Sequence, residues 1–192
     1  TNAHQIVQGQ MPELGRKDGD FFFLPNQDPV SIRDTIVDLC LRRLPASYGY
    51  SPVFDIQVLS PGRKGELGTI ALNQSLQSAV NPPEKGIKKE ITVNGVLLRE
   101  GDKVMQVRNN YEIVWNRIGG EQGVGAYNGD IGIVESINLR ERSMVVRMDD
   151  RRLLYPAENL NELEIAYAIT VHKSQGSEFP AVILPVAQVP PR

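Results

Sequence analysis

The strongest constraint on the fold is a change of pattern in the middle of the chain. Between about residues 85 and 161 no long helical stripe of apolar residues occurs, and short β-like runs follow one another instead. Glycine turns such as Asn94-Gly95 and Asn128-Gly129 separate these runs. The stretch predicts a small all-β barrel of roughly 70 residues. The expected strands are Ile91–Val93, Val96–Leu98, Val104–Val107, Ile131–Ile137, Met144–Met148 and Leu153–Tyr155.

The flanks of this stretch have an alternating α/β pattern. Asp28-Pro29 is typical of a helix start, because a capping side chain precedes a proline at the first helical position. Asn81-Pro82-Pro83 is a helix stop. Before the barrel we expect strands at Gly19–Leu24 and Ile56–Leu59, and helices from Pro29 to Pro45 and from Glu66 to Val80. After it we expect a strand at Ile165–Thr170, a short helix at His172–Glu178 and a strand at Ala181–Val186.

Composition excludes several classes of protein. The chain has 192 residues, 41% of them hydrophobic, which is enough for a packed core. The net charge of -2 argues mildly against a dedicated nucleic-acid module but leaves room for a local basic strip. Cys40 is the single cysteine, so neither an intramolecular disulfide nor a cysteine-cluster metal site can form, and a buried thiol on a helix is expected.

No apolar run is long enough to span a membrane, and no leader pattern occurs, so a cytoplasmic protein is the default expectation. The chain begins Thr1-Asn2-Ala3 and stops at Pro190-Pro191-Arg192 soon after an apolar strand. Both ends look as if cut from something longer.

The segment Ser60–Gly68, SPGRKGELG, is the first candidate for chemistry. It lies where a strand ends and a helix begins, the edge at which open α/β sheets bind ligands. Its glycines would let backbone amides approach an anion, and Arg63 and Lys64 add positive charge. It is not a Walker A loop, because GxxxxGK[ST] is absent from the chain. A simple surface turn is the alternative interpretation.

The segment Thr170–Phe179, TVHKSQGSEF, is the second candidate. It packs many hydrogen-bonding side chains into one strand-to-helix turn, which is costly where a buried strand ends unless something binds there. Gly176 permits close backbone approach, and His172 beside Lys173 is better explained by phosphate contacts than by a structural role.

This segment resembles motif V of superfamily 1 helicases, and the wider run ELEIAYAITVHKSQGSEFPAVILP resembles the RecD/TraA branch. That branch holds the 5′-to-3′ superfamily 1B DNA helicases and includes the alpha subunit of exodeoxyribonuclease V. The runs DIQVLSPGRKGELGTIALNQSLQ, GDKVMQVRNNYE and YNGDIGIVESI resemble the same branch, so the resemblance covers nearly the whole chain.

The resemblance implies a fold. Residues 1–85 and 161–192 would form an incomplete second motor domain (2A), an α/β domain with the RecA-like parallel sheet of P-loop NTPases. Residues 86–160 would form its inserted SH3-like β-barrel (2B).

The resemblance also implies roles for particular residues. Motif V would contact the backbone of single-stranded DNA through Thr170, His172 and Lys173. Its second half would face the nucleotide through Gln175, Gly176 and Glu178, with Glu178 at the ribose hydroxyl. The remaining expected DNA contacts are Ser60, Arg63 and Asn109, although the residues themselves also allow Asn109 the alternative role of fixing a turn.

The resemblance finally implies ATP and Mg²⁺ as cofactors of the full-length protein. Its implied partners are single-stranded DNA, the first motor domain of the same chain and other exodeoxyribonuclease V subunits. Phosphoryl transfer needs a phosphate cradle, Mg²⁺ and an arginine together, and Walker A, Walker B and motif VI are missing here. The 192-residue chain alone is therefore predicted not to hydrolyse ATP.

Several side chains keep two interpretations. Tyr111, Trp115 and Tyr127 lie in an expected long loop, Asn109–Asn128, where they would either stack on bases or close the end of the barrel. Phe21–Phe23 is expected to be core. A strip formed by Arg140, Arg142, Arg147, Arg151 and Arg152 is either a binding surface or a solvated strand face.

A second class of function stays open at this point. The chain would then be a non-motor module that binds nucleic acid or protein through the SH3-like barrel. The Thr170–Phe179 segment separates the two hypotheses, because a pure binding module has no use for a glutamate that faces a nucleotide.

Overall fold

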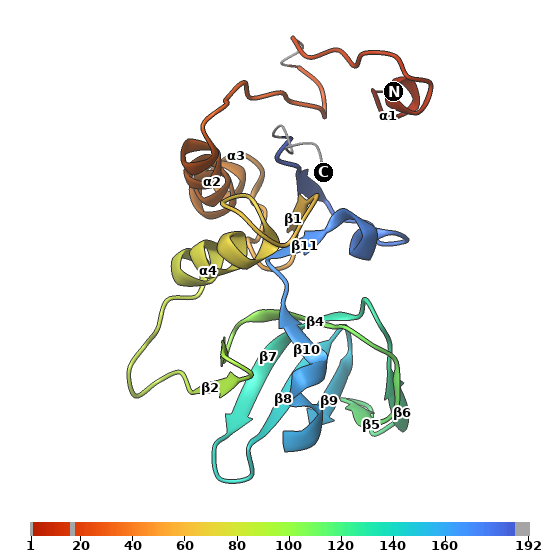
Figure 1. Cartoon of the computed structure of the whole chain (residues 1–192). Coiled ribbons are helices and arrows are strands. Elements are labelled where there is room, and N and C mark those ends of the chain that lie inside the picture. The colour runs from red at the N-terminus through yellow and green to blue at the C-terminus, as the bar shows by residue number, and fades with distance from the viewer. Residues whose placement is uncertain (1, 16–17, 187–192) are drawn as a thin grey trace.

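The computed structural model describes residues 2–15 and 18–186. Within them a small parallel sheet lies next to a larger antiparallel sheet (Figure 1). The parallel sheet has the order β11-β1-β12, with β1 at Ile56–Ser60, β11 at Ala168–Thr170 and β12 at Ala181–Ile183. The predicted α/β sheet with an all-β insertion is thus confirmed.

Helices cover one side of the parallel sheet (Figure 1). They are α2 (Pro29–Asp38), the π-helix η1 (Leu39–Arg43), α3 (Leu44–Tyr48) and α4 (Thr69–Val80). As predicted, Asp28 caps α2, its carboxylate accepting from the Ser31 N–H at 2.8 Å. In α4, Leu72 and Leu76 are buried. Among the described residues, no helix is both long and apolar enough to cross a membrane.

The predicted helix stop at Pro45 is wrong. The chain stays helical to Tyr48, and Gly49, in the left-handed region with φ 70°, ends it. The wider turn of η1 lets the Leu44 N–H donate to Leu39 O, and Pro45 then stands in the first turn of α3. A proline needs no N–H donor at that position, so it does not break the helix.

The insertion is an antiparallel sheet of seven strands in the order β10-β4-β7-β8-β9-β5-β6, beside the hairpin β2-β3. The hairpin strands are β2 (Glu90–Val93) and β3 (Val96–Arg99), and the seven-stranded sheet begins with β4 (Lys103–Gln106). A 3₁₀-helix, η2 (Ala157–Glu162), precedes the last strand of that sheet. The rest of the sheet consists of β5 (Asn110–Arg117), β6 (Gln122–Ala126), β7 (Ile131–Asn138), β8 (Ser143–Met148), β9 (Arg151–Tyr155) and β10 (Leu163–Ile165).

The expected long loop at Asn109–Asn128 is instead the hairpin β5-β6. Its turn carries Gly119 and Gly120, and Trp115 of β5 pairs with Gly123 of β6. A strand this rich in glycine has little periodic hydrophobicity, which is why pattern analysis misses it.

The expected strand at Ile165–Thr170 is divided between two sheets. β10 pairs with β4, and the Ala166 N–H still donates to Lys103 O at 2.8 Å. From Tyr167 onward the chain bonds to β1 instead, since Tyr167 O accepts from the Val58 N–H at 3.3 Å. A continuous apolar run cannot reveal such a change of partner.

The buried carboxylate of Asp102 ties the two sheets together. It accepts from the side chains of Gln77 and Asn81 at 2.6 and 2.8 Å, from the Arg99 N–H at 2.7 Å and from the Tyr167 hydroxyl at 3.1 Å. Burial raises the pKa of Asp102, although these four donors act to lower it. One apolar core also runs through both sheets, and it includes Ile56, Leu72, Val104, Val146 and Leu153.

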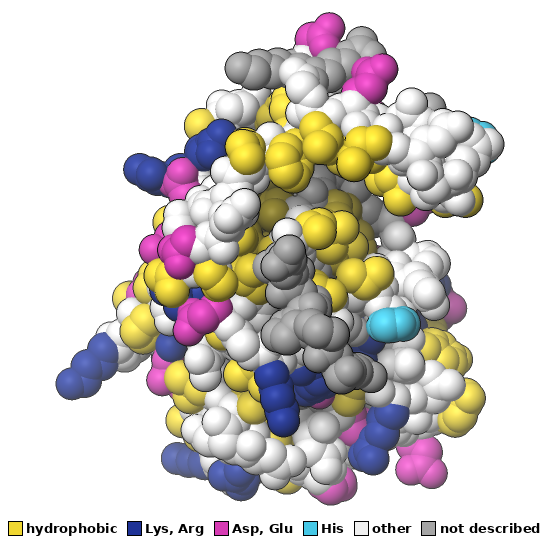
Figure 2. All heavy atoms as spheres, turned by 45° about the horizontal axis from the view of Figure 1, so that its top comes forward, with side chains coloured by type: hydrophobic (Ala, Val, Ile, Leu, Met, Phe, Trp, Pro, Cys, Tyr) yellow, Lys and Arg dark blue, Asp and Glu magenta, His cyan; other side chains and the backbone are white. Residues whose placement is uncertain are grey.

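Two apolar expectations fail. No strand forms at Gly19–Leu24, and Phe22 and Phe23 are 51% and 49% exposed rather than core. β12 is shorter than the expected strand at Ala181–Val186, and Val182 within it is 50% exposed. Figure 2 shows hydrophobic side chains gathered on the upper part of the face that it turns forward. Apolar composition predicts burial only where another layer is present to cover it.

The N-terminal helix α1 (Asn2–Val7) lies apart from the sheets in Figure 1. Cys40 on η1 is buried as expected, and burial raises the pKa of its thiol to about 12. An inert structural thiol is the result.

Candidate nucleic-acid interface

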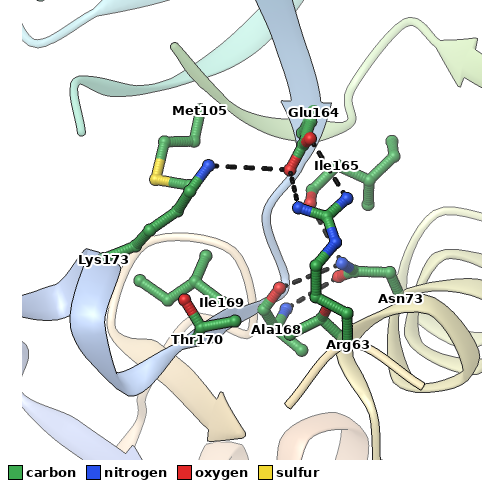
Figure 3. Close-up of a pocket in the computed structure, with 10 residues that line it drawn as sticks. Arg63, Asn73, Met105, Glu164, Ile165, Ala168, Ile169, Thr170 and Lys173 are labelled. Carbon is green, nitrogen blue, oxygen red and sulfur yellow. Dashed lines mark hydrogen bonds and ion pairs between the residues drawn. The ribbon is translucent and has the colours of Figure 1, made fainter. Parts of the chain in front are cut away.

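A shallow pocket lies at the carboxyl ends of the adjacent parallel strands β1 and β11 (Figure 3). Ser60 and Thr170, the last residues of these strands, are partners in the register. Ligands of open α/β sheets bind outside this edge. The pocket is lined by Arg63, Thr69, Asn73, Met105, Glu164, Ile165, Ala168, Ile169, Thr170 and Lys173.

Three charged side chains meet over this pocket. Arg63 donates through both terminal nitrogens to the two carboxylate oxygens of Glu164, at 3.2 and 3.3 Å. The ammonium group of Lys173 lies 3.7 Å from the same carboxylate. Arg63 follows β1 and Lys173 belongs to the 3₁₀-helix η3 (Val171–Ser174) after β11, whereas Glu164 comes from β10. The structure thus brings together two cations that the sequence analysis singled out.

Asn73 of α4 fixes the backbone below these charges. Its amide nitrogen donates to Ile165 O and Ala168 O at 3.0 and 2.9 Å, and its amide oxygen accepts from the Ala168 N–H at 2.7 Å. The stretch between β10 and β11 is thereby held against the helix. Sequence analysis missed Asn73 and Glu164, because each acts through partners about 90 to 100 residues away in sequence.

Ser60 and the loop after it serve the loop's own structure. The Ser60 side chain is fully buried and donates to Leu67 O at 2.6 Å, so a direct DNA contact by Ser60 would require this loop to change conformation. The N–H groups of Thr69 and Ile70 donate to Gly62 O and Arg63 O, at 3.0 and 3.2 Å. Loop carbonyls therefore already use these two amides, which favours the alternative interpretation of a surface turn at this helix start, whereas an anion at the loop's glycine amides stays a prediction.

The rest of the Thr170–Phe179 segment is largely exposed. His172 projects from η3 and is exposed, whereas Thr170 and Lys173 are half-buried. The turn that follows is closed by the Ser177 N–H, which donates to Ser174 O at 3.0 Å. Gly176 has φ 83°, a conformation that favours glycine. The predicted short helix is shorter than expected, and Gln175, Gly176 and Glu178 present themselves on an exposed turn.

Asn109 and the aromatic residues lie in the barrel, outside the residues that line the pocket. Asn109 accepts from the Asn128 N–H at 2.9 Å and so holds two turns together. Tyr111 and Tyr127 are 66% and 45% exposed and meet edge to face, with ring centroids 6.0 Å apart. These two tyrosines therefore do not close the end of the barrel, whereas Trp115 is half-buried over β6.

Two arginines of the strip, Arg151 and Arg152, pair with acidic side chains of the barrel. Arg152 forms two hydrogen bonds with Glu135, at 2.6 and 2.7 Å. Arg151 lies 3.5 Å from Asp130, and Arg147 lies over the ring of Phe54 at 5.7 Å. For Arg151 and Arg152 these contacts favour the interpretation of a solvated strand face.

Comparison with known proteins gives two matching families. Residues 72–148 match the SH3 domain of ATP-dependent RecD-like DNA helicases, and residues 165–192 match the UvrD-like helicase C-terminal domain. The first match contains most of the antiparallel sheet, and the second begins at the end of β10.

Residues 72–148 belong to the family of RecD-like DNA helicase SH3 domains.

Two relatives agree with this assignment. The chain is 34% identical over 128 residues to the ATP-dependent RecD2 DNA helicase of Deinococcus radiodurans, an alignment that covers 67% of this chain and 16% of that protein. It is 33% identical over 131 residues to the RecBCD enzyme subunit RecD of Buchnera aphidicola, covering 67% of this chain and 20% of that protein. This RecD-like chain therefore spans a fifth or less of the length of these relatives.

Solved structures give weaker likenesses. A Pif1 helicase from Bacteroides in complex with ADP-AlF3 and single-stranded DNA superimposes with a TM-score of 0.42 and 19% identity, covering 83% of this chain and 40% of that one. A structure of two Pif1 helicases at forked double-stranded DNA gives a TM-score of 0.40, also at 19% identity.

Proposed function

We propose that this chain forms part of an ATP-dependent DNA helicase that moves 5′ to 3′ along single-stranded DNA. The RecD-like SH3 match and the UvrD-like C-terminal match support this proposal, as does the 34% sequence identity to a RecD2 helicase. ATP and Mg²⁺ would be cofactors of the full-length protein, and the 192-residue chain alone would not hydrolyse ATP. DNA repair and recombination in the cytoplasm, with exodeoxyribonuclease V subunits as partners, belong to the same proposal.

The proposed division of the chain is a second RecA-like motor domain at residues 1–85 and 161–192, with the SH3-like barrel between them. β10 hydrogen-bonds to the barrel strand β4, which favours a return point near residue 166 over one at residue 161. The first motor domain of the same polypeptide would be the partner across the nucleotide.

The DNA-facing surface in this proposal consists of Arg63, Thr170, His172 and Lys173. The observation that carries it is the convergence of Arg63, Thr170 and Lys173 on one pocket at the ends of adjacent parallel strands. Side chains of this kind position a protein on phosphates without reading bases, so little sequence preference is expected.

The nucleotide-facing surface in this proposal consists of Gln175, Gly176 and Glu178. Their exposed turn directly follows the DNA-facing residues, so one short segment would face both ligands. The segment would then couple closure on ATP to movement of the DNA strand.

The first test is salt-dependent binding of single-stranded DNA to the 192-residue chain. Arg63→Ala with Lys173→Ala should weaken binding and lower the log–log salt slope by about 1.4, because each neutralised phosphate contributes about 0.7. Thr170→Ala with His172→Ala should also weaken binding. Arg42→Ala with Arg43→Ala removes the same charge from exposed positions on η1 and is the control. If the control variant lowers the salt slope and the Arg63 and Lys173 double variant does not, the proposed DNA-facing surface is wrong.

A barrel-centred binding module is the second candidate, favoured by the exposed pair Tyr111 and Tyr127. Tyr111→Ala with Tyr127→Ala should then cost about 1–3 kcal/mol for each base that loses a stacking partner. If this double variant abolishes binding and the Arg63 and Lys173 double variant does not change it, the barrel is the functional part.

A further inference from the structure

The carboxylate of Glu164 contacts both cations of the pocket, Arg63 and Lys173. Glu164 stands on β10, opposite Met105 of β4, and therefore belongs to the barrel sheet. Its side chain crosses to the loops that follow β1 and β11, as Figure 3 shows. Among the residues lining the pocket it is the only acidic one.

The contacts of Glu164 use the donors that a phosphate would need. Arg63 presents both of its terminal nitrogens to the carboxylate, at 3.2 and 3.3 Å, and Lys173 approaches to 3.7 Å. An arginine fork binds carboxylate and phosphate in the same two-pronged way. A phosphate oxygen therefore cannot take both nitrogens of Arg63 while Glu164 holds them.

The ion pair that holds the Glu164 carboxylate is exposed to solvent. The Glu164 side chain is 39% exposed, and that of Arg63 is 55% exposed, so the ion pair lies at the surface. Arg63 and Lys173 are the partners of the Glu164 carboxylate among the described residues. Such exposed pairs are weak, and a ligand of higher negative charge can replace them.

We propose that Glu164 is a gating residue, a carboxylate that competes with the DNA backbone for Arg63 and Lys173. Without DNA it neutralises part of their charge, and a backbone phosphate enters when the side chain rotates away. Through Glu164 the barrel thereby lowers the affinity for polyanions of the pocket at the ends of β1 and β11. This inference rests on the proposed DNA-facing role of Arg63 and Lys173.

A positioning role for Glu164 would change DNA affinity in the opposite direction. If Glu164 held Arg63 and Lys173 in the geometry that binds phosphate, its removal would weaken binding. Glutamine at this position keeps the shape and one acceptor oxygen but removes the charge, so Glu164→Gln separates competition from positioning.

The experiment measures binding of a fluorescent oligodeoxythymidylate by anisotropy over a range of NaCl concentrations. Glu164→Gln should bind about 2- to 5-fold more tightly at low salt, the size expected for an exposed ion pair. The gain should disappear in the background of Arg63→Ala with Lys173→Ala, because additivity fails only for residues that interact.

The matched control is Glu66→Gln. Glu66 lies in the same loop as Arg63 and is 50% exposed, but it pairs with Arg33 at 2.6 Å instead of with the pocket cations. Glu66→Gln therefore removes the same charge as Glu164→Gln, close to the pocket but outside it. A gain equal to that of Glu164→Gln would reduce the effect to net charge and overturn the gating role, as would weaker or unchanged binding by Glu164→Gln.

Failure of the gating role is distinguishable from failure of the proposed function. If the wild-type chain binds and the Arg63 and Lys173 double variant binds equally well, the proposed DNA-facing surface is wrong. If binding depends on these cations but Glu164→Gln brings no gain, only the gating role is wrong. Binding by Glu164→Gln where the wild type shows none supports gating, and absence of binding by both contradicts both proposals.

Discussion

Lys103 of β4 is a lysine whose ammonium group lies in the interior. The residue is 2% exposed, its Nζ donates to Ile56 O at 3.2 Å, and the ring of Phe179 lies 5.8 Å away. Burial lowers the pKa of Lys103 to about 8. Because Phe179 ends the Thr170–Phe179 segment, this lysine also joins the barrel to the proposed coupling segment.

The buried ammonium makes stability depend on pH. Between about pH 8 and 10.5 the unfolded lysine is protonated and the folded one is not, so the unfolded state binds more protons and stability rises with pH. Relative to Lys103→Met, the free energy of unfolding should rise by roughly 2–4 kcal/mol across this window, at about 1.4 kcal/mol per pKa unit.

Urea unfolding at each pH measures this difference. Both chains should carry Cys40→Ala. Burial raises the pKa of this thiol to about 12, so its own contribution to the free energy of unfolding would otherwise fall as pH rises through the alkaline range. A difference between the two chains that stays flat from pH 8 to 10.5 would show that the ammonium is solvated.

At the scale of elements, the hairpin β5-β6 depends on a glycine under an aromatic ring. A Cβ atom on Gly123 would lie 2.3 Å from the ring of Trp115, its partner across the hairpin. The guanidinium groups of Arg117 and Arg151 stand 5.4 and 5.9 Å from that ring. Only glycine leaves room for this packing.

Gly123→Ala should therefore displace Trp115 and destabilise the protein by about 1–3 kcal/mol, the usual cost of overpacking. Trp115 is the single tryptophan, so its emission reports the displacement directly as a red shift. Gly119→Ala is the control, since no atom lies within 4 Å of a Cβ there and its φ is not positive. Equal effects of the two substitutions would contradict the role of the ring contact.

At the scale of the molecule, the two sheets share one core and the buried carboxylate of Asp102. That core contains residues of α4, the parallel sheet and the barrel. Removing a buried charge that accepts four hydrogen bonds leaves its donors unpaired, which is costly. The barrel and the parallel sheet should therefore unfold as one cooperative unit.

Two probes separate the parts in a urea titration. Trp115 fluorescence follows the barrel, and circular dichroism at 222 nm follows the helices, which lie mainly beside the parallel sheet. The two transitions should coincide. Asp102→Ala should move both midpoints together to a lower urea concentration and reduce the free energy of unfolding by about 3 kcal/mol or more. Asp34→Ala, at an exposed carboxylate, should change both little. Separate transitions would mean that the barrel folds independently.

Local sequence determined the elements that rest on local physics. Asp28-Pro29 predicts the start of α2, because capping needs only neighbouring residues. Alternation predicts β8, where Met144, Val146 and Met148 point inward. The change of period near residue 85 predicts the all-β insertion, and TVHKSQGSEF predicts the helicase family.

Tertiary structure alone decided the rest of the candidate site. Glu164 and Ala168 belong to different sheets because the strands with which they pair lie far away in the sequence. The ion pair between Glu164 and Arg63 likewise joins residues that are 101 positions apart. The burial of Ser60 and of Lys103 likewise depends on what packs over them. Hydrogen-bond partners and desolvation are properties of position in space, and a local pattern carries no record of them.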